Sequence, residues 1–242
     1  MTDAFKHLPA LRGRITPPEK SELRATPEVL ALWDERARSL GRAADWRLCE
    51  QAIEDSRKAV LGHLDLGAGL WVYGYGSLMW DPAIHFAEVR RADLPGHQRR
   101  FNFQTNIARG TVEQPALMLS LEAGSGCCQG LAFHIGGDLA EAESAILWRR
   151  EMIRGAYVPM ILPIVTPQGN VPALVFTSNA SHPDYVGDLP LQDTAAIIAS
   201  AAGVMGTNRD YLEQMARQLE ILDIQDDYVA QLILKVREIF GA

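Results

Sequence analysis

A strand-like segment that ends in a glycine-spaced loop is the first place where this chain could bind a small molecule. Tyr73, Gly74, Tyr75, Gly76 and Ser77 follow one another there. Glycine can adopt backbone conformations that other residues avoid, and it lets amide N–H groups approach a carboxylate with no Cβ in the way. The aromatic side chains can form walls. The pattern predicts a ligand-binding loop, and the alternative is a tight turn whose glycines serve only geometry.

Two better-known motifs do not fit this loop. The spacing begins like a dinucleotide fingerprint, but Met79 occupies the position of the third glycine and no crossover helix follows. Ser77 does not lie in a nucleophile elbow, because Tyr75 and Met79 stand where that motif requires glycine. A Gly-Lys-Ser or Gly-Lys-Thr phosphate loop occurs nowhere in the sequence. These patterns exclude the common nucleotide sites and the hydrolase serine.

Glu151 is the candidate for proton transfer. Trp148 and Leu147 precede it by three and four positions, so a helix places its carboxylate on the same face as two large apolar groups. Burial disfavours the charged form and raises the pKa of a carboxyl group, which suits a general base that works near neutral pH. The alternative is a surface glutamate that forms an ion pair with Arg150 or Arg154.

The remaining candidates give weaker signals. Arg109 precedes Gly110 in a loop, where it could hold a carboxylate through two parallel hydrogen bonds or could form a surface ion pair. Cys127, Cys128 and His134 lack the ligand spacing of a zinc site, so we expect no metal and interpret the two cysteines as core residues.

Composition limits the classes of partner. The net charge is −7, and residues 1–65 contribute nothing to it, because they contain 11 basic and 11 acidic side chains. The remaining residues contain 12 basic and 19 acidic side chains. An acidic domain with scattered arginines is a poor match for nucleic acid. No apolar run approaches the roughly 18 residues of a membrane span, residues 1–20 are polar, and three cysteines fit a reducing compartment without disulfides. We expect a cytoplasmic protein, and a monomer because no coiled-coil pattern occurs.

The elements that must position these residues follow from periodicity and turn signals. Helices are expected over 27–40, 45–63, 138–154, 193–202, 208–222 and 226–240. Strands are expected over 70–75, 86–94, 97–104, 116–121, 128–135, 157–165 and 171–177. Pro95-Gly96 and Gly124-Ser125-Gly126 are interpreted as turns, and prolines 159, 163 and 172 as signs of edge or bent strands. The order predicts an α+β fold with a mostly antiparallel sheet or small barrel, a helical extension over 1–65 and a main domain over 66–242.

Four segments together resemble one family, the ChaC-like γ-glutamylcyclotransferases. They are Val72 to Leu78, Arg109 to Thr111, Trp148 to Tyr157 and Asn208 to Leu212, and their order and spacing match as well. The resemblance covers about residues 70–240. It implies a mixed α+β fold around a small β-barrel and the cleavage of glutathione to 5-oxoproline and Cys-Gly with no metal or organic cofactor.

The resemblance also implies roles for single residues. Glu151 stands at the position of the family's catalytic glutamate. The family's substrate loop, which holds the γ-glutamyl group, corresponds to Tyr75, Gly76, Ser77 and Leu78. Family tyrosines near the substrate correspond to Tyr157 and Tyr211. The segment after Arg109 departs from the pattern at Val112 and Gln114, which leaves recognition of the distal end of the substrate open.

The chemistry of the residues agrees with this implication. A γ-glutamyl amide carries its own nucleophile, the α-amine, so the enzyme needs one proton shuttle, and Glu151 can serve as both base and acid. Two alternatives stay open. One is a cyclotransferase for other γ-glutamyl amides or dipeptides, for which Arg109 would be dispensable, and the other is a non-catalytic module that binds γ-glutamyl compounds.

Overall fold

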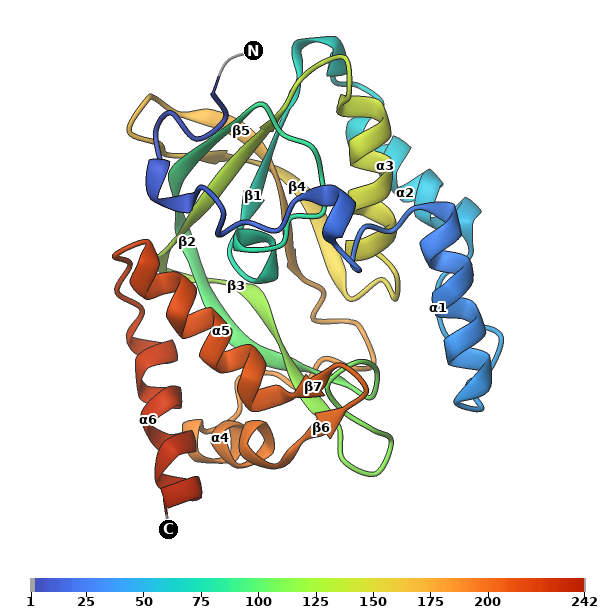
Figure 1. Ribbon diagram of the computed structural model, residues 1–242, viewed down its shortest axis with the longest axis vertical. Coiled ribbons are helices and arrows are strands. Elements are labelled where there is room, and N and C mark those ends of the chain that lie inside the picture. Colours follow the sequence, from blue (N-terminus) through green and yellow to red (C-terminus); the bar gives the residue numbers. More distant parts are fainter. Residues whose placement is uncertain (1–2, 242) are drawn as a thin grey trace. The chain divides into compact units, whose positions relative to one another are not determined.

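The computed structural model describes residues 3–241 (Figure 1). The helices are α1 (Pro27–Ser39), α2 (Glu50–Leu61), α3 (Ala140–Glu151), α4 (Leu191–Ser200), α5 (Asn208–Ile221) and α6 (Asp227–Gly241). The strands are β1 (Leu70–Gly74), β2 (Glu88–Thr105), β3 (Ala116–Ile135), β4 (Tyr157–Ile164), β5 (Val171–Ser178), β6 (Ala202–Gly203) and β7 (Gly206–Thr207). Each expected helix is confirmed within a few residues, apart from α2, which begins later than expected.

The main sheet has the strand order β2-β3-β1-β5-β4. β1 runs antiparallel to β3, with Tyr73 opposite Ala132, and parallel to β5, with Val72 opposite Leu174. The sheet is therefore mixed and curls into a half-barrel, and the expected α+β class is confirmed. β6 and β7 form a separate two-stranded hairpin.

Two expected turns are wrong, because β2 and β3 are long continuous strands. Pro95 and Gly96 lie inside β2, and Gly124 lies inside β3. Gly96 has a φ of 74°, which glycine alone tolerates easily, and a Cβ built on it would lie 3.8 Å from the carbonyl oxygen of Gly124. The two glycine-containing segments thus lie side by side on paired strands. The positive φ of Gly96 is thus accommodated within a continuous strand and does not reverse the chain.

The proline signals in the last two strands of the main sheet have different outcomes. Pro159 and Pro163 lie in β4, which is an edge strand, as expected. Pro172 lies in β5, between β1 and β4, so the edge interpretation is wrong for that strand. It is the second residue of β5 and is exposed, and at the start of a strand a missing N–H does least harm.

The described chain forms two compact units. One contains the residues up to Pro95 and Gln129–Thr177, and the other contains Gly96–Cys128 and the residues from Ser178 onward. In the first unit, α2 packs on α3, and Ile53 of α2 shares a buried apolar cluster with Trp148 of α3. The N-terminal helices thus belong to the same unit as β1 and α3. The division into a 1–65 extension and a 66–242 domain stays a prediction.

Polar bonds join the N-terminal segment to α3 within the first unit. Arg24 donates two hydrogen bonds of 2.7 Å to the two carboxylate oxygens of Glu143. The indole N–H of Trp148 donates to the hydroxyl of Ser56 on α2 at 2.7 Å. Because these partners are far apart in sequence, the N-terminal helices and α3 stabilise each other.

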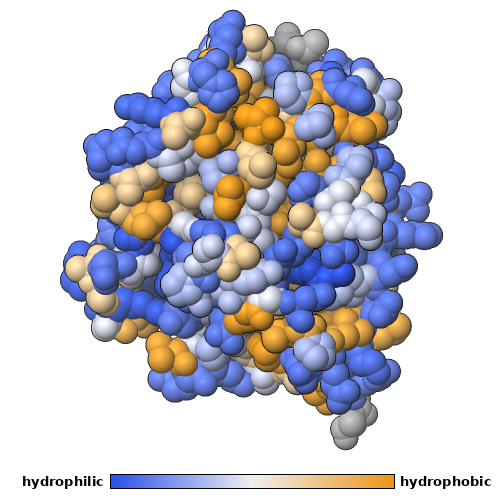
Figure 2. Space-filling model, turned by 180° about the vertical axis from the view of Figure 1, so that it is seen from behind, coloured by the Kyte–Doolittle hydropathy of each residue, from blue (hydrophilic) through white to orange (hydrophobic). Residues whose placement is uncertain are grey.

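The surface of the described residues mixes polar and apolar side chains. Figure 2 shows one face, on which hydrophobic side chains form separate patches among hydrophilic ones. Large exposed hydrophobic residues occur on different elements, for example Leu32 on α1, Val112 in a loop and Leu234 on α6. Such scattered exposure is ordinary for globular proteins. Within residues 3–241, no helix combines the length and apolar character needed to cross a membrane.

Candidate functional site

The glycine-spaced loop follows β1 directly and closes in one tight helical turn. Strand β1 ends at Gly74, and the turn η4 spans Ser77–Met79. The carbonyl oxygen of Gly76 accepts from Met79 N at 2.9 Å, and that of Ser77 accepts from Asp81 N at 2.9 Å. Among the backbone–backbone hydrogen bonds that residues 3–241 form outside helices and strands, none has the N–H of Gly76, Ser77 or Leu78 as its donor. The start of this turn therefore presents backbone donors that an anionic group can use.

The two glycines of the loop differ in backbone conformation. Gly74 lies in β1 and outside the left-handed region, so the expectation of a special backbone conformation is wrong there. Gly76 has φ −126° and ψ −132°, a combination outside both the α and the β region that glycine adopts more easily than other residues. A Cβ on Gly74 would lie 3.0 Å from the Cβ of Leu78 and 3.2 Å from the ring of Phe133. Close packing thus explains the glycine at 74.

The side chains of the loop anchor it in the core. Tyr75 and Leu78 are buried, and Leu78 belongs to the same apolar cluster as Leu147 and Trp148 of α3. These side chains hold the loop against the helix, so the backbone is the part of the loop best placed to meet a ligand.

Glu151 is the last residue of α3, and its environment combines both alternatives considered for it. Its side chain is 14% exposed, while Leu147 and Trp148 before it are fully buried. One carboxylate oxygen lies 3.0 Å from Nε of Arg150. Burial raises the pKa of Glu151, and the positive charge of Arg150 lowers it in part. The group is both desolvated and paired.

Arg150 connects the loop with Glu151. Its side chain is 8% exposed and donates one hydrogen bond of 2.9 Å to the hydroxyl of Ser77 and one of 2.6 Å to the carbonyl oxygen of Asp81. Two predicted site residues, Ser77 and Glu151, therefore meet on one guanidinium. From the sequence, Arg150 is expected only as a possible ion-pair partner of Glu151. Seventy-three positions separate it from Ser77, so no local pattern indicates their bond.

Asp81 is a second polar group that the sequence analysis did not select. Its Oδ1 atom is buried and has no hydrogen-bond partner among residues 3–241. A buried carboxylate oxygen without a donor is costly, so this atom is suited to a donor supplied from outside the chain. Its place at the end of the glycine-spaced loop is the signal that could have identified it.

Tyr157 lies in the same unit as Glu151. It opens β4 and is half-buried, and its ring centre is 6.5 Å from that of Phe176. Phe176 in turn packs edge-on against Trp148 at 5.4 Å. Tyr157 thus belongs to the aromatic group that surrounds the end of α3.

Arg109 and Tyr211 lie together in the second unit. Nη1 of Arg109 donates to the carbonyl oxygen of Thr207 at 2.8 Å, and its guanidinium carbon lies 5.6 Å from the centre of the Tyr211 ring. The ring of Tyr211 also meets Phe101 edge-on at 6.0 Å. The predicted residues therefore form two groups, one in each compact unit.

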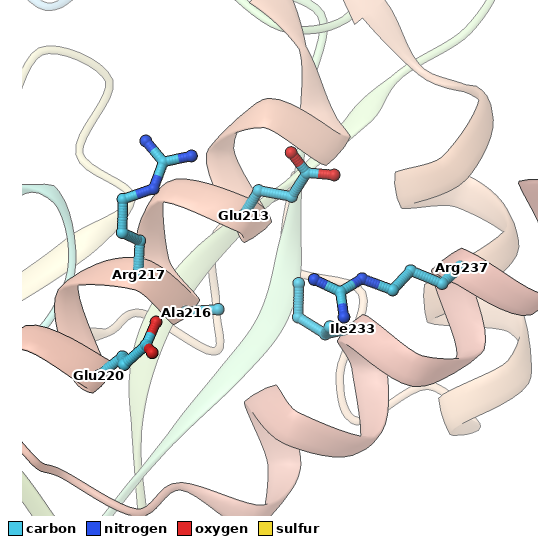
Figure 3. A pocket seen from close by; sticks show the side chains of 6 residues that line it. All are labelled: Glu213, Ala216, Arg217, Glu220, Ile233 and Arg237. Carbon is cyan, nitrogen blue, oxygen red and sulfur yellow. The ribbon is translucent and has the colours of Figure 1, made fainter.

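The second unit also contains a groove of about 260 Å³ between α5 and α6. Figure 3 shows its lining, with Glu213, Arg217 and Glu220 contributed by α5 and Ile233 and Arg237 by α6. Both signs of charge alternate along it. None of the predicted site residues lines this groove, so it is separate from the chemistry considered above.

The cysteines have mixed environments. Cys128 is buried, as expected of a core residue, whereas Cys127 is exposed, so the core interpretation is wrong for Cys127. Neighbouring residues of a strand point to opposite faces, which explains the difference. In the part of the chain that the structure describes, none of the cysteines forms a disulfide, and no three His, Cys, Asp or Glu side chains are arranged to hold a metal ion.

Comparison with known proteins gives consistent matches. The sequence model of the family described as ChaC-like protein matches residues 70–239. "Glutathione-specific gamma-glutamylcyclotransferase" of Escherichia coli K12 is 39% identical over 173 residues, which cover 71% of this chain and 74% of that protein. "Glutathione-specific gamma-glutamylcyclotransferase 1" of Danio rerio is 32% identical over 191 residues, covering 74% and 97%.

A solved structure supports the fold. The crystal structure of a γ-glutamyl cyclotransferase specific to glutathione from yeast superposes with a TM-score of 0.64, covering 71% of this chain and 96% of that one. The sequence identity is 20%. A likeness at this identity shows the fold alone, which is of the expected type.

Proposed function

The chain belongs to the ChaC-like family, and on that premise we propose that it is a γ-glutamylcyclotransferase that cleaves glutathione into 5-oxoproline and Cys-Gly. The names of the two relatives described above support this substrate. The observation that carries the chemistry is the buried carboxylate of Glu151, tied through Arg150 to the loop with unused backbone donors.

The reaction is an intramolecular acyl transfer. The α-amine of the γ-glutamyl group attacks the γ-carbonyl carbon, a C–N bond closes the five-membered lactam, and the amide bond to cysteine breaks. Of the three hydrogens on the starting ammonium, one stays on the lactam nitrogen and two end on the departing amine. Because the substrate supplies its own nucleophile, the proposed reaction requires no cofactor.

Glu151 moves these protons in the proposed mechanism. An ammonium has no lone pair, so the ionised carboxylate first accepts a proton from the α-ammonium group and delivers it to the leaving nitrogen; the ring nitrogen gives up its second proton after the C–N bond has formed, and the carboxylate passes that proton to the departing amine in the same way. A raised pKa favours the protonated form of Glu151 and so favours the second step. One residue therefore acts as base and as acid.

The loop orients the substrate. The N–H groups of Gly76, Ser77 and Leu78 receive the α-carboxylate of the γ-glutamyl group or the oxyanion that develops on the γ-carbonyl. Holding the flexible chain in its ring-closing conformation contributes strongly to the rate, because effective molarities of well-oriented intramolecular reactions reach about 10⁵ M or more.

The remaining predicted residues hold the loop in place or contact other parts of the substrate. Tyr75 anchors the loop, Tyr157 and Tyr211 contact the substrate, and Arg109 recognises its distal end. Arg109 still has N–H groups beyond the one that binds Thr207, since a guanidinium carries five donors. A cytoplasmic location, a monomeric state and a catalytic domain over 66–242 complete the proposal.

Release of 5-oxoproline from glutathione by the purified protein tests this function. Glu151→Gln keeps the size of the side chain but cannot accept a proton, so we expect the turnover number to fall by about 10²- to 10⁴-fold. Glu141→Gln is the matched control, because Glu141 lies on the same helix with 71% of its side chain exposed. Equal turnover by the parent and Glu151→Gln would overturn the assignment.

The same assay separates the alternatives. Turnover of γ-glutamyl dipeptides in preference to glutathione would indicate a broader cyclotransferase, and Arg109→Ala would then leave the rate unchanged. A glutathione-specific enzyme loses affinity in that variant. Binding of glutathione with no product from any γ-glutamyl compound would indicate a non-catalytic module.

A further inference from the structure

Arg150 uses each side of its guanidinium on a different partner. Nε lies 3.0 Å from Oε1 of Glu151, Nη1 donates to the backbone carbonyl of Asp81, and Nη2 donates to the hydroxyl of Ser77. These partners come from the helix end and from both ends of the turn that follows Gly76. The side chain is 8% exposed, so these bonds form where little water competes for them.

We propose that Arg150 is a positioning residue of the reaction: it fixes the turn from Ser77 to Asp81 against the end of α3 and orients the Glu151 carboxylate toward a substrate held by that turn. This inference rests on the proposed function. Arg150 acts through Glu151 and the loop and does not itself contact the reacting atoms.

The geometry requires arginine in particular. A planar guanidinium presents five N–H donors in fixed directions, so one side chain can bind a carboxylate, a carbonyl oxygen and a hydroxyl at once. A lysine ammonium keeps the charge but has a single nitrogen, which cannot reach partners on both ends of the turn. Arg150→Lys therefore separates the role of the positive charge from the role of the several N–H donors that the guanidinium holds in fixed directions.

The charge of Arg150 has a second effect on Glu151. Burial raises the pKa of the Glu151 carboxyl and the neighbouring guanidinium lowers it, so loss of the positive charge leaves burial unopposed. The carboxylate must be ionised to accept the first proton. Without Arg150, the acidic limb of the rate profile therefore moves to higher pH.

Other ionisable groups occur around the end of α3. Arg149 is paired with Glu50 of α2, with Nε at 3.1 Å from Oε2. Asp81, Arg154 and Tyr157 are ionisable residues on the adjoining segments, and Arg47 lies on the segment whose Leu48 N–H donates to the carbonyl oxygen of Ile153. Glu151 forms its ion pair with Arg150 on its own helix, and the charge of Arg150 lowers the pKa of Glu151 against the effect of burial. Arg149 is thus a suitable control, because it carries the same charge on the next residue but binds a different partner.

The test compares Arg150→Gln, Arg150→Lys and Arg149→Gln by steady-state kinetics across pH with glutathione. For Arg150→Gln we expect kcat/KM to fall about 100-fold or more and the acidic limb to move to higher pH. For Arg150→Lys we expect the acidic limb of the parent with a raised KM, because the charge remains and the N–H donors in fixed directions are lost. Arg149→Gln should behave like the parent.

An NMR titration of the ¹³C-labelled Glu151 carboxyl, assigned by its loss in Glu151→Gln, gives the same comparison without turnover. If the parent releases no 5-oxoproline, the proposed function fails, while a higher titration midpoint in Arg150→Gln than in Arg149→Gln still supports the coupling. An unmoved limb and an unmoved midpoint in folded Arg150→Gln overturn the inference. If Arg150→Gln does not fold, Arg150→Lys decides, since parent-like kcat and KM in that variant would also overturn it.

Discussion

Arg24 ties the N-terminal segment to α3, and we predict that its replacement by leucine destabilises the protein far more than loss of a surface ion pair. Both terminal nitrogens of Arg24 donate to Glu143 at 2.7 Å, and Nη1 also donates to the carbonyl oxygen of Ala83 at 2.8 Å. The Glu143 carboxylate also accepts the N–H of His85 at 3.1 Å. The Arg24–Glu143 pair thus joins the N-terminal segment before α1, helix α3 and the segment that follows the candidate substrate loop.

The expected magnitude follows from burial. The side chain of Glu143 is 4% exposed and that of Arg24 is 17% exposed. Removing one partner of a buried ion pair leaves an uncompensated charge and costs about 3–5 kcal/mol of unfolding free energy. Replacing both residues by leucine removes the stranded charge, so the double variant should be more stable than Arg24→Leu. It still leaves the Ala83 carbonyl and the His85 N–H without their partners, at about 1–3 kcal/mol each.

Urea denaturation of the parent, the single variant and the double variant measures these differences. Arg12→Leu is the control, because Arg12 forms an ion pair with Asp3 in the same N-terminal segment but both side chains are about half exposed, at 54% and 46%. We expect a change of about 0–1 kcal/mol there. A cost below about 1 kcal/mol for Arg24→Leu would refute the reasoning that burial makes this pair costly to break.

Two further variants test the packing and the pH dependence. Gly74→Ala brings a Cβ to 3.0 Å from the Cβ of Leu78, and overpacking of this kind costs about 1–3 kcal/mol of unfolding free energy. Gly126→Ala is the control and should be tolerated, because its Cβ would meet nothing closer than 3.6 Å. Equal melting temperatures for the two variants would contradict this prediction. The hydrogen bond from Arg47 lowers the pKa of Asp34 in the folded protein. The ionised Asp34 carboxylate therefore stabilises the fold fully at pH values above its pKa in the unfolded chain, and this stabilisation is lost as the pH falls through the lower pKa of the folded protein. Asp34→Asn should therefore lose less stability than the parent on acidification, and parallel pH curves from urea titrations would exclude this contribution.

Local signals predicted the helices well. Pro27 follows Thr26, whose hydroxyl accepts the N–H of Val29, and the same kind of cap precedes α5, where Thr207 and Asp210 form a capping box. Such contacts lie within one turn of the helix, so the sequence contains all the partners. Apolar spacing predicted both helices, and Thr26 followed by Pro27 also marked the start of α1.

The long strands were harder to predict because their stability depends on distant partners. Pro95-Gly96 has the composition of a turn, but both residues lie inside β2, where Gly96 is close to Gly124 of the neighbouring strand. Turn propensity is a preference of a few residues, and pairing over many positions overrides it. For this reason the sequence predicted four short strands, over 86–94, 97–104, 116–121 and 128–135, where the structure has the two long strands β2 and β3.

The candidate site shows the same division between local and distant information. The partial burial of Glu151 could be predicted, because Trp148 lies three positions earlier on the same helix face. The ion pair with Arg150 was also one of the expected alternatives, but the bond from Arg150 to Ser77 could not be predicted, because these residues meet only after β1 and α3 have packed. Burial alone favours the protonated form of Glu151, which cannot accept the first proton, and an exposed ion pair alone would hold it too acidic to deliver one. A carboxylate that is both desolvated and paired with a guanidinium can occupy either state, and the bond from that guanidinium to the substrate loop places this balance where the proposed reaction needs it.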